Sequence, residues 1–118
     1  MKPLLVCALL ALVPLGAAAR ERFACNLKAL STTERARYQE VTKALIAATQ
    51  EKRELPNGYG LRLPAASLLT AAEWVSLERR CCPFFTFELE QARDEGPLWL
   101  RITGAEGVKA FIRSEFQL

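Results

Sequence analysis

The chain has 118 residues, of which 51% are apolar and 25% are charged, and it contains no histidine. This length and composition predict one globular domain and exclude a disordered chain. Without histidine, the chain has no histidine metal ligand, no histidine pH switch, and neither a Ser-His-Asp nor a Cys-His catalytic arrangement.

Residues 1–19 have the pattern of a secretory signal peptide. Lys2 provides a positive start, residues 3–16 form an apolar run, and alanines at 17–19 suit cleavage after Ala19. The apolar run is too short to span a bilayer comfortably, although an uncleaved N-terminal anchor is an alternative. We therefore expect an exported protein, periplasmic or secreted, whose mature chain is a single domain over residues 20–118 with no stable membrane span.

The charge of the mature chain argues against a nucleic-acid partner. Removing residues 1–19 would remove one lysine and no acidic residue, which leaves a net charge of about +2. No run of like charge is longer than a few residues. A protein that neutralises nucleic-acid phosphates normally carries a concentrated basic patch.

The first predicted element after the leader is a helix. Ser31 and Glu34 match a capping box, and apolar residues at helical spacing follow them. The helix is expected to end near Arg53 or Glu54, because Pro56 and an Asn-Gly turn come next.

A short strand and a second helix are predicted next. Apolar residues alternate over 59–63, which indicates a strand. The second helix should extend from about Ser67 to Cys81. Pro83 ends it, because the residue before a proline is disfavoured in the helical conformation.

The remaining chain predicts a hairpin and a final helix. Apolar residues alternate over 85–90 and again over 98–103, with a turn between them, and a second capping box begins at Thr103. The sequence therefore predicts an α+β fold, with a small, mainly antiparallel three-stranded sheet and about three helices packed on one face.

Three cysteines and one carboxylate are the distinctive candidates for chemistry. Each residue of a helix advances about 100° around the axis, so Glu78, Cys81 and Cys82 should meet at the last turn of the second helix. Cys25 lies in an extended segment before the first helix and could reach this turn. Thiolates select Cu(I), Zn and related soft ions. Three thiols would suit trigonal Hg, As(III) or Cu(I), and Glu78 would complete a tetrahedral zinc site.

Two other interpretations of the cysteines stay open. In an oxidising compartment, Cys25 would pair with Cys81 or Cys82, and the third cysteine would be buried as a small apolar residue. The second interpretation is thiol redox or detoxification chemistry, with Glu78 as a proton donor. A helix C-terminus disfavours a thiolate and there is no Cys-x-x-Cys motif, which argues against a thioredoxin-like nucleophile.

Several segments carry a resemblance. They are Cys25-Asn26-Leu27, the segment Glu78-Arg79-Arg80-Cys81-Cys82-Pro83-Phe84, and shorter stretches between and after them. Through these segments, nearly the whole mature chain resembles a poorly characterised family of small bacterial proteins. The Cys-Cys-Pro-Phe segment also resembles one appended to some heavy-metal-responsive regulators. The resemblance implies a compact domain with these three cysteines as its signature, and it implies no established activity.

We therefore favour a binding protein over an enzyme. The hypothesis is an exported small domain that captures a thiophilic metal or metalloid, such as Zn, Cu(I), Hg or As(III), through Cys25, Cys81 and Cys82, with Glu78 as a fourth ligand or proton acceptor. No catalytic residue is predicted. The alternatives are a thiol-dependent detoxification or redox enzyme and a disulfide-stapled cell-envelope adaptor without metal chemistry.

Overall fold

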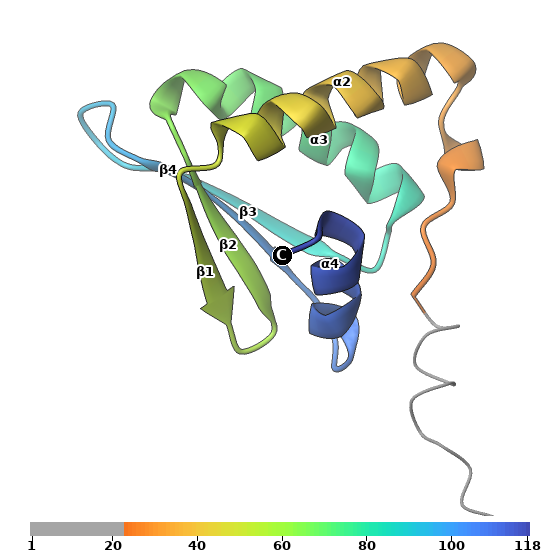
Figure 1. The fold of residues 1–118 in the computed structure, drawn as a ribbon. Helices are drawn as coiled ribbons and strands as arrows, with labels where there is room; N and C mark the ends of the chain where they lie inside the picture. Colours follow the sequence, from red (N-terminus) through yellow and green to blue (C-terminus); the bar gives the residue numbers. More distant parts are fainter. Residues whose placement is uncertain (1–22) are drawn as a thin grey trace, which may run out of the picture.

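The computed structural model describes residues 23–118 (Figure 1). The predicted signal peptide lies outside these described residues. Three α-helices and four strands follow one another along the chain, with two short 3-10 turns, η1 and η2. In chain order the elements are η1 (Leu27–Ala29), α2 (Thr32–Ala48), β1 (Glu51–Leu55), β2 (Gly58–Leu63), η2 (Ala65–Ser67), α3 (Leu68–Cys81), β3 (Thr86–Gln91), β4 (Leu98–Thr103) and α4 (Val108–Phe116).

The sheet has four strands in the order β1-β2-β4-β3, and every neighbouring pair is antiparallel. The prediction of three strands was therefore wrong. The missing strand is β1, which the sequence assigned to the end of the first helix. In the structure α2 ends at Ala48, and the backbone N–H of Gln50 already donates to the carbonyl of Arg62 in β2.

Local sequence preference explains this error. Glu51 to Glu54 are residues that favour helices, and they continue the helical pattern without a break. Pairing with β2 through the tight turn at Pro56-Asn57 overrides that preference. As an edge strand, β1 is exposed and carries charges of both signs, which is how proteins commonly protect a sheet edge.

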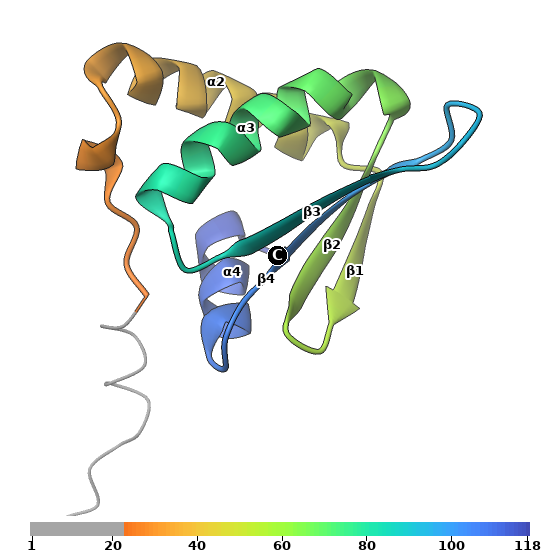
Figure 2. The same cartoon turned by 180° about the vertical axis from the view of Figure 1, so that it is seen from behind.

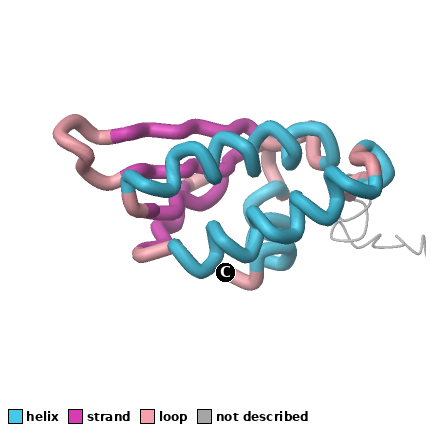
Figure 3. Tube along the Cα trace, turned by 90° about the horizontal axis from the view of Figure 1, so that it is seen from above, coloured by secondary structure: helices cyan, strands magenta, loops and turns pink. Residues whose placement is uncertain are grey.

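The inner face of the sheet forms the core with the helices. Tyr59, Leu61 and Leu63 of β2 are buried, and they lie opposite the buried Ile102, Leu100 and Leu98 of β4, respectively. The α+β class is confirmed, and β3 pairs antiparallel with β4 as the predicted hairpin requires. Seen from above, the helices lie along one side of the strands (Figure 3).

Helices α2 and α3 lie side by side over the sheet (Figure 2). The Arg37 guanidinium of α2 donates two hydrogen bonds of 2.7 Å to the Glu73 carboxylate of α3, and the Trp74 indole donates to the Thr42 hydroxyl at 3.1 Å. These contacts fix the rotation of α3, and Glu78 and Cys81 therefore point into the core. None of the helices within residues 23–118 combines the length and apolar character needed to cross a membrane.

Candidate functional site

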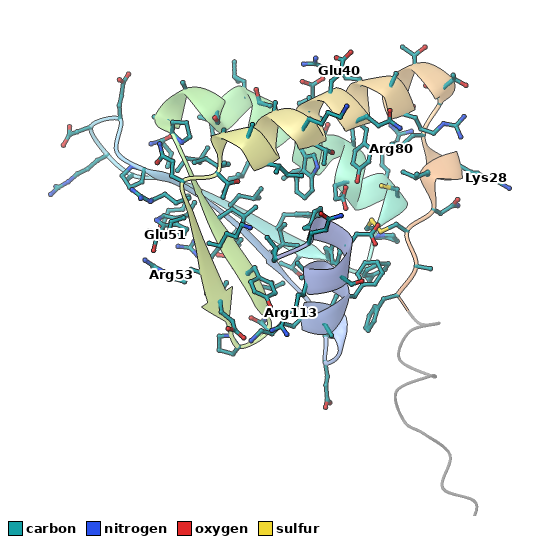
Figure 4. All side chains as sticks on the ribbon, viewed as in Figure 1. Lys28, Glu40, Glu51, Arg53, Arg80 and Arg113 are labelled. Carbon is teal, nitrogen blue, oxygen red and sulfur yellow. A yellow bond between two sulfur atoms is a disulfide. The ribbon has the colours of Figure 1, made fainter. Side chains whose placement is uncertain are left out.

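The candidate site lies where the end of α3 meets the N-terminal segment, defined as residues 23–30. Cys81 is the last residue of α3 and Cys82 caps it, because Pro83 cannot continue the helix. In Figure 4 the yellow sulfur atoms lie between this end of α3 and the N-terminal segment. The structure thus brings Cys25 to the cysteine pair, a proximity that the sequence left open.

Cys25 and Cys82 form a disulfide, with a Cα–Cα distance of 4.6 Å and a sequence separation of 57 residues. Cys81 is a free, buried thiol. This is one of the two pairings that the sequence allowed for an oxidising compartment. The bond joins the N-terminal segment to the end of α3.

Polar contacts also hold the N-terminal segment in place. The backbone N–H of Asn26 donates to the carbonyl of Cys81 at 2.8 Å. The Arg80 guanidinium donates to the carbonyl of Ala29 at 3.0 Å and forms an ion pair with Glu34 at the start of α2. These contacts attach the residues that follow Cys25 to the end of α3.

Apolar contacts fix the two ends of the same segment. The Phe23 ring lies 5.2 Å from the Phe84 ring and 6.4 Å from the Phe111 ring, measured between centroids. At the other end, Leu30 is 2% exposed. Both ends of the segment are therefore anchored in the core, and its position does not depend on the disulfide alone.

Glu78 is the buried carboxyl of the site. Its side chain lies one helical turn before Cys82 and is fully buried. Burial raises its pKa to about 7, a nearby Tyr38 hydroxyl opposes this rise, and the charge of Glu115 adds to it. Its second oxygen, Oε2, is buried without a hydrogen-bond partner among the described residues.

The other carboxyl oxygen of Glu78, Oε1, lies 3.1 Å from the Sγ of Cys82. A disulfide sulfur has no proton to donate, so a hydrogen bond at this distance requires that the Glu78 carboxyl be protonated. The contact and the raised pKa of Glu78 agree with each other. With a pKa of about 7, the Glu78 carboxyl beside the oxidised cysteine pair is protonated at acidic pH and loses this proton near neutral pH.

The Cys81 thiol is buried and is a poor nucleophile while the disulfide is closed. Its Sγ lies 3.4 Å from the carbonyl oxygen of Glu78 and 3.8 Å from that of Leu77. Burial raises the pKa of this thiol to about 11, and the charge of Glu78 contributes to the rise. The thiol is thus protonated at neutral pH, as expected at a helix C-terminus.

Three of the four predicted site residues lie together, and the Cys25–Cys82 disulfide itself joins two of them. One sulfur each from Cys25 and Cys82 and one carboxylate oxygen of Glu78 all lie within 4.8 Å of one another. The fourth, Cys81, lies beside the group, with its Sγ 3.8 Å from that of Cys82. Two sulfurs and an oxygen are a suitable donor set for a soft ion once the disulfide is reduced.

Tyr38 was not among the predicted site residues, although its hydroxyl acts on Glu78 from α2. Its position at helical spacing indicated core packing, and the side chain is partly buried against the core. Burial beside the Glu78 carboxyl raises the pKa of Tyr38 well above its usual range. No spacing rule connects two residues on different helices, so the sequence held no signal for this pair.

Comparisons of the chain with protein-family models, curated proteins and solved structures find no match. The resemblance carried by the cysteine segments thus remains a prediction. The function is therefore inferred from the geometry of the site.

Proposed function

We propose that the reduced protein captures a thiophilic metal or metalloid ion with Cys25, Cys82 and Glu78, and that Cys81 supplies a further thiol. The observation that supports this most is the donor group itself, in which two sulfurs and a carboxylate oxygen lie within 4.8 Å of one another. Ligands brought together by the fold lose little freedom when an ion binds.

The contacts around the disulfide favour a site that stays assembled after reduction. The Asn26–Cys81 backbone hydrogen bond, the Arg80–Ala29 hydrogen bond and the burial of Leu30 do not involve either sulfur of the bond. Reduction would therefore leave Cys25 near Cys82. An ion could then replace the covalent bond as the link between the segment and α3.

The donor types favour soft ions over hard ones. Thiolates prefer Cu(I), Zn, Hg and As(III), whereas Mg and Ca require several oxygen ligands. Glu78 could supply the oxygen ligand, because its buried Oε2 atom accepts no well-formed hydrogen bond among the described residues, although the nearby Tyr38 hydroxyl favours the charged carboxylate. Cys81 and Cys82 are adjacent, and adjacent side chains diverge, which favours a low coordination number.

The test is an anaerobic titration of reduced protein, freed of reductant, with Cu(I) and with As(III). Native mass spectrometry would count bound ions, and ultraviolet absorption would detect metal–thiolate bonds. We expect one ion per chain, with loss of binding in Cys25→Ser and in Cys82→Ser. Glu78→Gln should weaken binding, whereas Glu88→Gln, the same change at an exposed carboxylate on β3, should not. Stoichiometric binding by a variant with all three thiols replaced by serine would reject the proposal.

A disulfide-stapled adaptor is the second candidate, and the formed Cys25–Cys82 bond favours it. On this alternative, reduction lowers the thermal stability and added ions have no effect on the reduced protein. The same titration separates the two functions.

We also propose that the protein acts outside the cytoplasm, because residues 1–19 have the signal-peptide pattern. Mass analysis of the protein isolated from its native compartment tests this. A mature chain that begins at residue 20 is expected, and an intact N-terminus on protein from the cytoplasm would refute export.

A further inference from the structure

The two cysteines of the disulfide are unequally exposed. Cys82 is fully buried at the end of α3. Cys25 is only partly buried, and it lies in an irregular stretch just before η1. Figure 4 shows the N-terminal segment on the outside of the helical layer. A reagent in solution can therefore approach the disulfide from the side of Cys25.

Thiol–disulfide exchange depends on which sulfur a thiolate can reach and on which thiolate departs. Attack on Cys25 would release Cys82 at a helix C-terminus, where a negative charge is disfavoured. Attack on Cys82 would release Cys25 at a more favourable place. However, Cys82 is fully buried, so a reagent could reach its sulfur only after the structure around it opens. We therefore expect a small thiolate to attack Cys25, because access to the sulfur matters more here than which thiolate departs.

We propose that the oxidised protein undergoes thiol–disulfide exchange with a small-molecule thiol at Cys25, and that this reaction converts the closed disulfide form into the ion-binding form. The conversion to the ion-binding form rests on the proposed ion capture. The exchange at Cys25 is an activity of the disulfide itself.

The reaction balances in two exchanges. A small thiolate attacks the Sγ of Cys25, the Cys25–Cys82 bond breaks, and Cys82 departs as a thiolate that takes a proton from the medium. A second small thiolate then attacks the small-molecule sulfur of the mixed disulfide and releases Cys25. The pair gains two electrons and two protons, and two small thiols become one small disulfide.

Cys81 is the internal competitor for this exchange. Its Sγ lies 3.8 Å from that of Cys82, and attack there would form a Cys81–Cys82 bond and release Cys25. The thiol of Cys81 is fully buried and directs its proton at the carbonyls of Leu77 and Glu78, and the two cysteines are consecutive at the end of a helix. Cys81 should therefore remain a thiol throughout.

The experiment treats the oxidised mature protein with a limited amount of 2-mercaptoethanol, quenches with acid, alkylates the free thiols and maps the cysteine peptides. We expect the mercaptoethanol adduct on Cys25 at least about tenfold more often than on Cys82, with loss of this preference in urea, because burial controls access to the sulfur. Adducts on Cys82, a Cys81–Cys82 bond, or reduction only by a protein dithiol would each overturn the proposal.

A parallel measurement of Cu(I) uptake separates this inference from the proposed function. Exchange at Cys25 without ion uptake would leave the exchange standing and refute ion capture. Ion uptake after phosphine reduction, with no exchange by 2-mercaptoethanol, would leave ion capture standing and refute the exchange. Equal uptake by oxidised and reduced protein would refute the conversion step.

Discussion

The Oε1 atom of Glu78 lies 3.1 Å from the Sγ of Cys82, and both side chains are fully buried. A carboxyl in this position is stable as a neutral acid while the disulfide is closed. On the proposed function, the same carboxyl would act as an oxygen ligand or a proton acceptor for thiols once the cysteines are reduced. This contact links the redox state of the cysteines to the charge of the site.

The Glu78 carboxyl should make stability depend on pH. Its pKa is about 7 in the folded protein, above its ordinary value of 4.5, so the folded state binds more protons than the unfolded state between these values. Stability is therefore full below about pH 4.5 and falls as the pH rises to 7. The loss is on the order of 3 kcal/mol. Urea titrations from pH 5 to pH 8 measure it.

A pair of variants controls this pH experiment. Glu78→Gln should remove the fall in stability between pH 5 and pH 8, because a neutral amide does not titrate. Glu73→Gln should retain it, since the pKa of Glu73 is lowered by Arg37 and its titration lies at lower pH. A wild-type free energy of unfolding that does not change over this range would contradict the burial account of Glu78.

Breaking the disulfide should destabilise the protein substantially. In the chain-entropy model, a bond that closes 57 residues contributes roughly 4 kcal/mol, within a usual range of about 2–5 kcal/mol. Cys25→Ser should therefore lower the urea midpoint by a corresponding amount, and the variant should no longer respond to reductant. A variant as stable as the oxidised wild type would show that the other contacts of the N-terminal segment are sufficient.

Ion binding should strengthen as the pH rises through 7. The thiols and the Glu78 carboxyl must lose protons before they bind a cation, and the pKa of Glu78 lies at about 7. Competition titrations with Cu(I) at pH 6, 7 and 8 would measure this. The increase should be smaller in Glu78→Gln, and an identical pH profile for the two proteins would argue that Glu78 is not a ligand.

The turn between β1 and β2 offers a test of the four-stranded sheet. A Cβ at Gly58 would overlap the carbonyl oxygen of Ile102 in β4, whereas a Cβ at Gly60 would lie 3.4 Å from the Trp99 ring, an ordinary contact. Gly58→Ala should therefore cost about 2 kcal/mol or more, and Gly60→Ala should be tolerated. Thermal unfolding of the two variants compares their stabilities directly. Equal stabilities would contradict the close packing of β2 against β4 at Gly58.

The sequence predicted the elements whose signals are local. The capping box at Ser31 and Glu34 is present in the structure, α3 ends at Cys81 as Pro83 requires, and the β3–β4 hairpin follows the apolar alternation. Strand β1 was missed because its residues favour helices locally, and only pairing with β2 makes them a strand.

The candidate site was only partly predictable for a related reason. Helical spacing placed Glu78 and the adjacent cysteines on one turn. The approach of Cys25 is a contact across 57 residues, which depends on how Phe23 and Leu30 pack in the finished core. The burial of Glu78 beside Tyr38 likewise depends on the rotation of α2 against α3. Such tertiary contacts leave no periodic signal in the chain.

The most direct test of ion capture is native mass spectrometry of the mature protein with one equivalent of Cu(I), measured in parallel on the oxidised and the anaerobically reduced forms. Ion capture by the reduced site predicts one bound ion on the reduced protein, none on the oxidised protein, and none on reduced Cys25→Ser. A reduced wild-type protein that binds no ion, or that binds no better than Cys25→Ser, would contradict the proposed function and leave a disulfide-stapled domain.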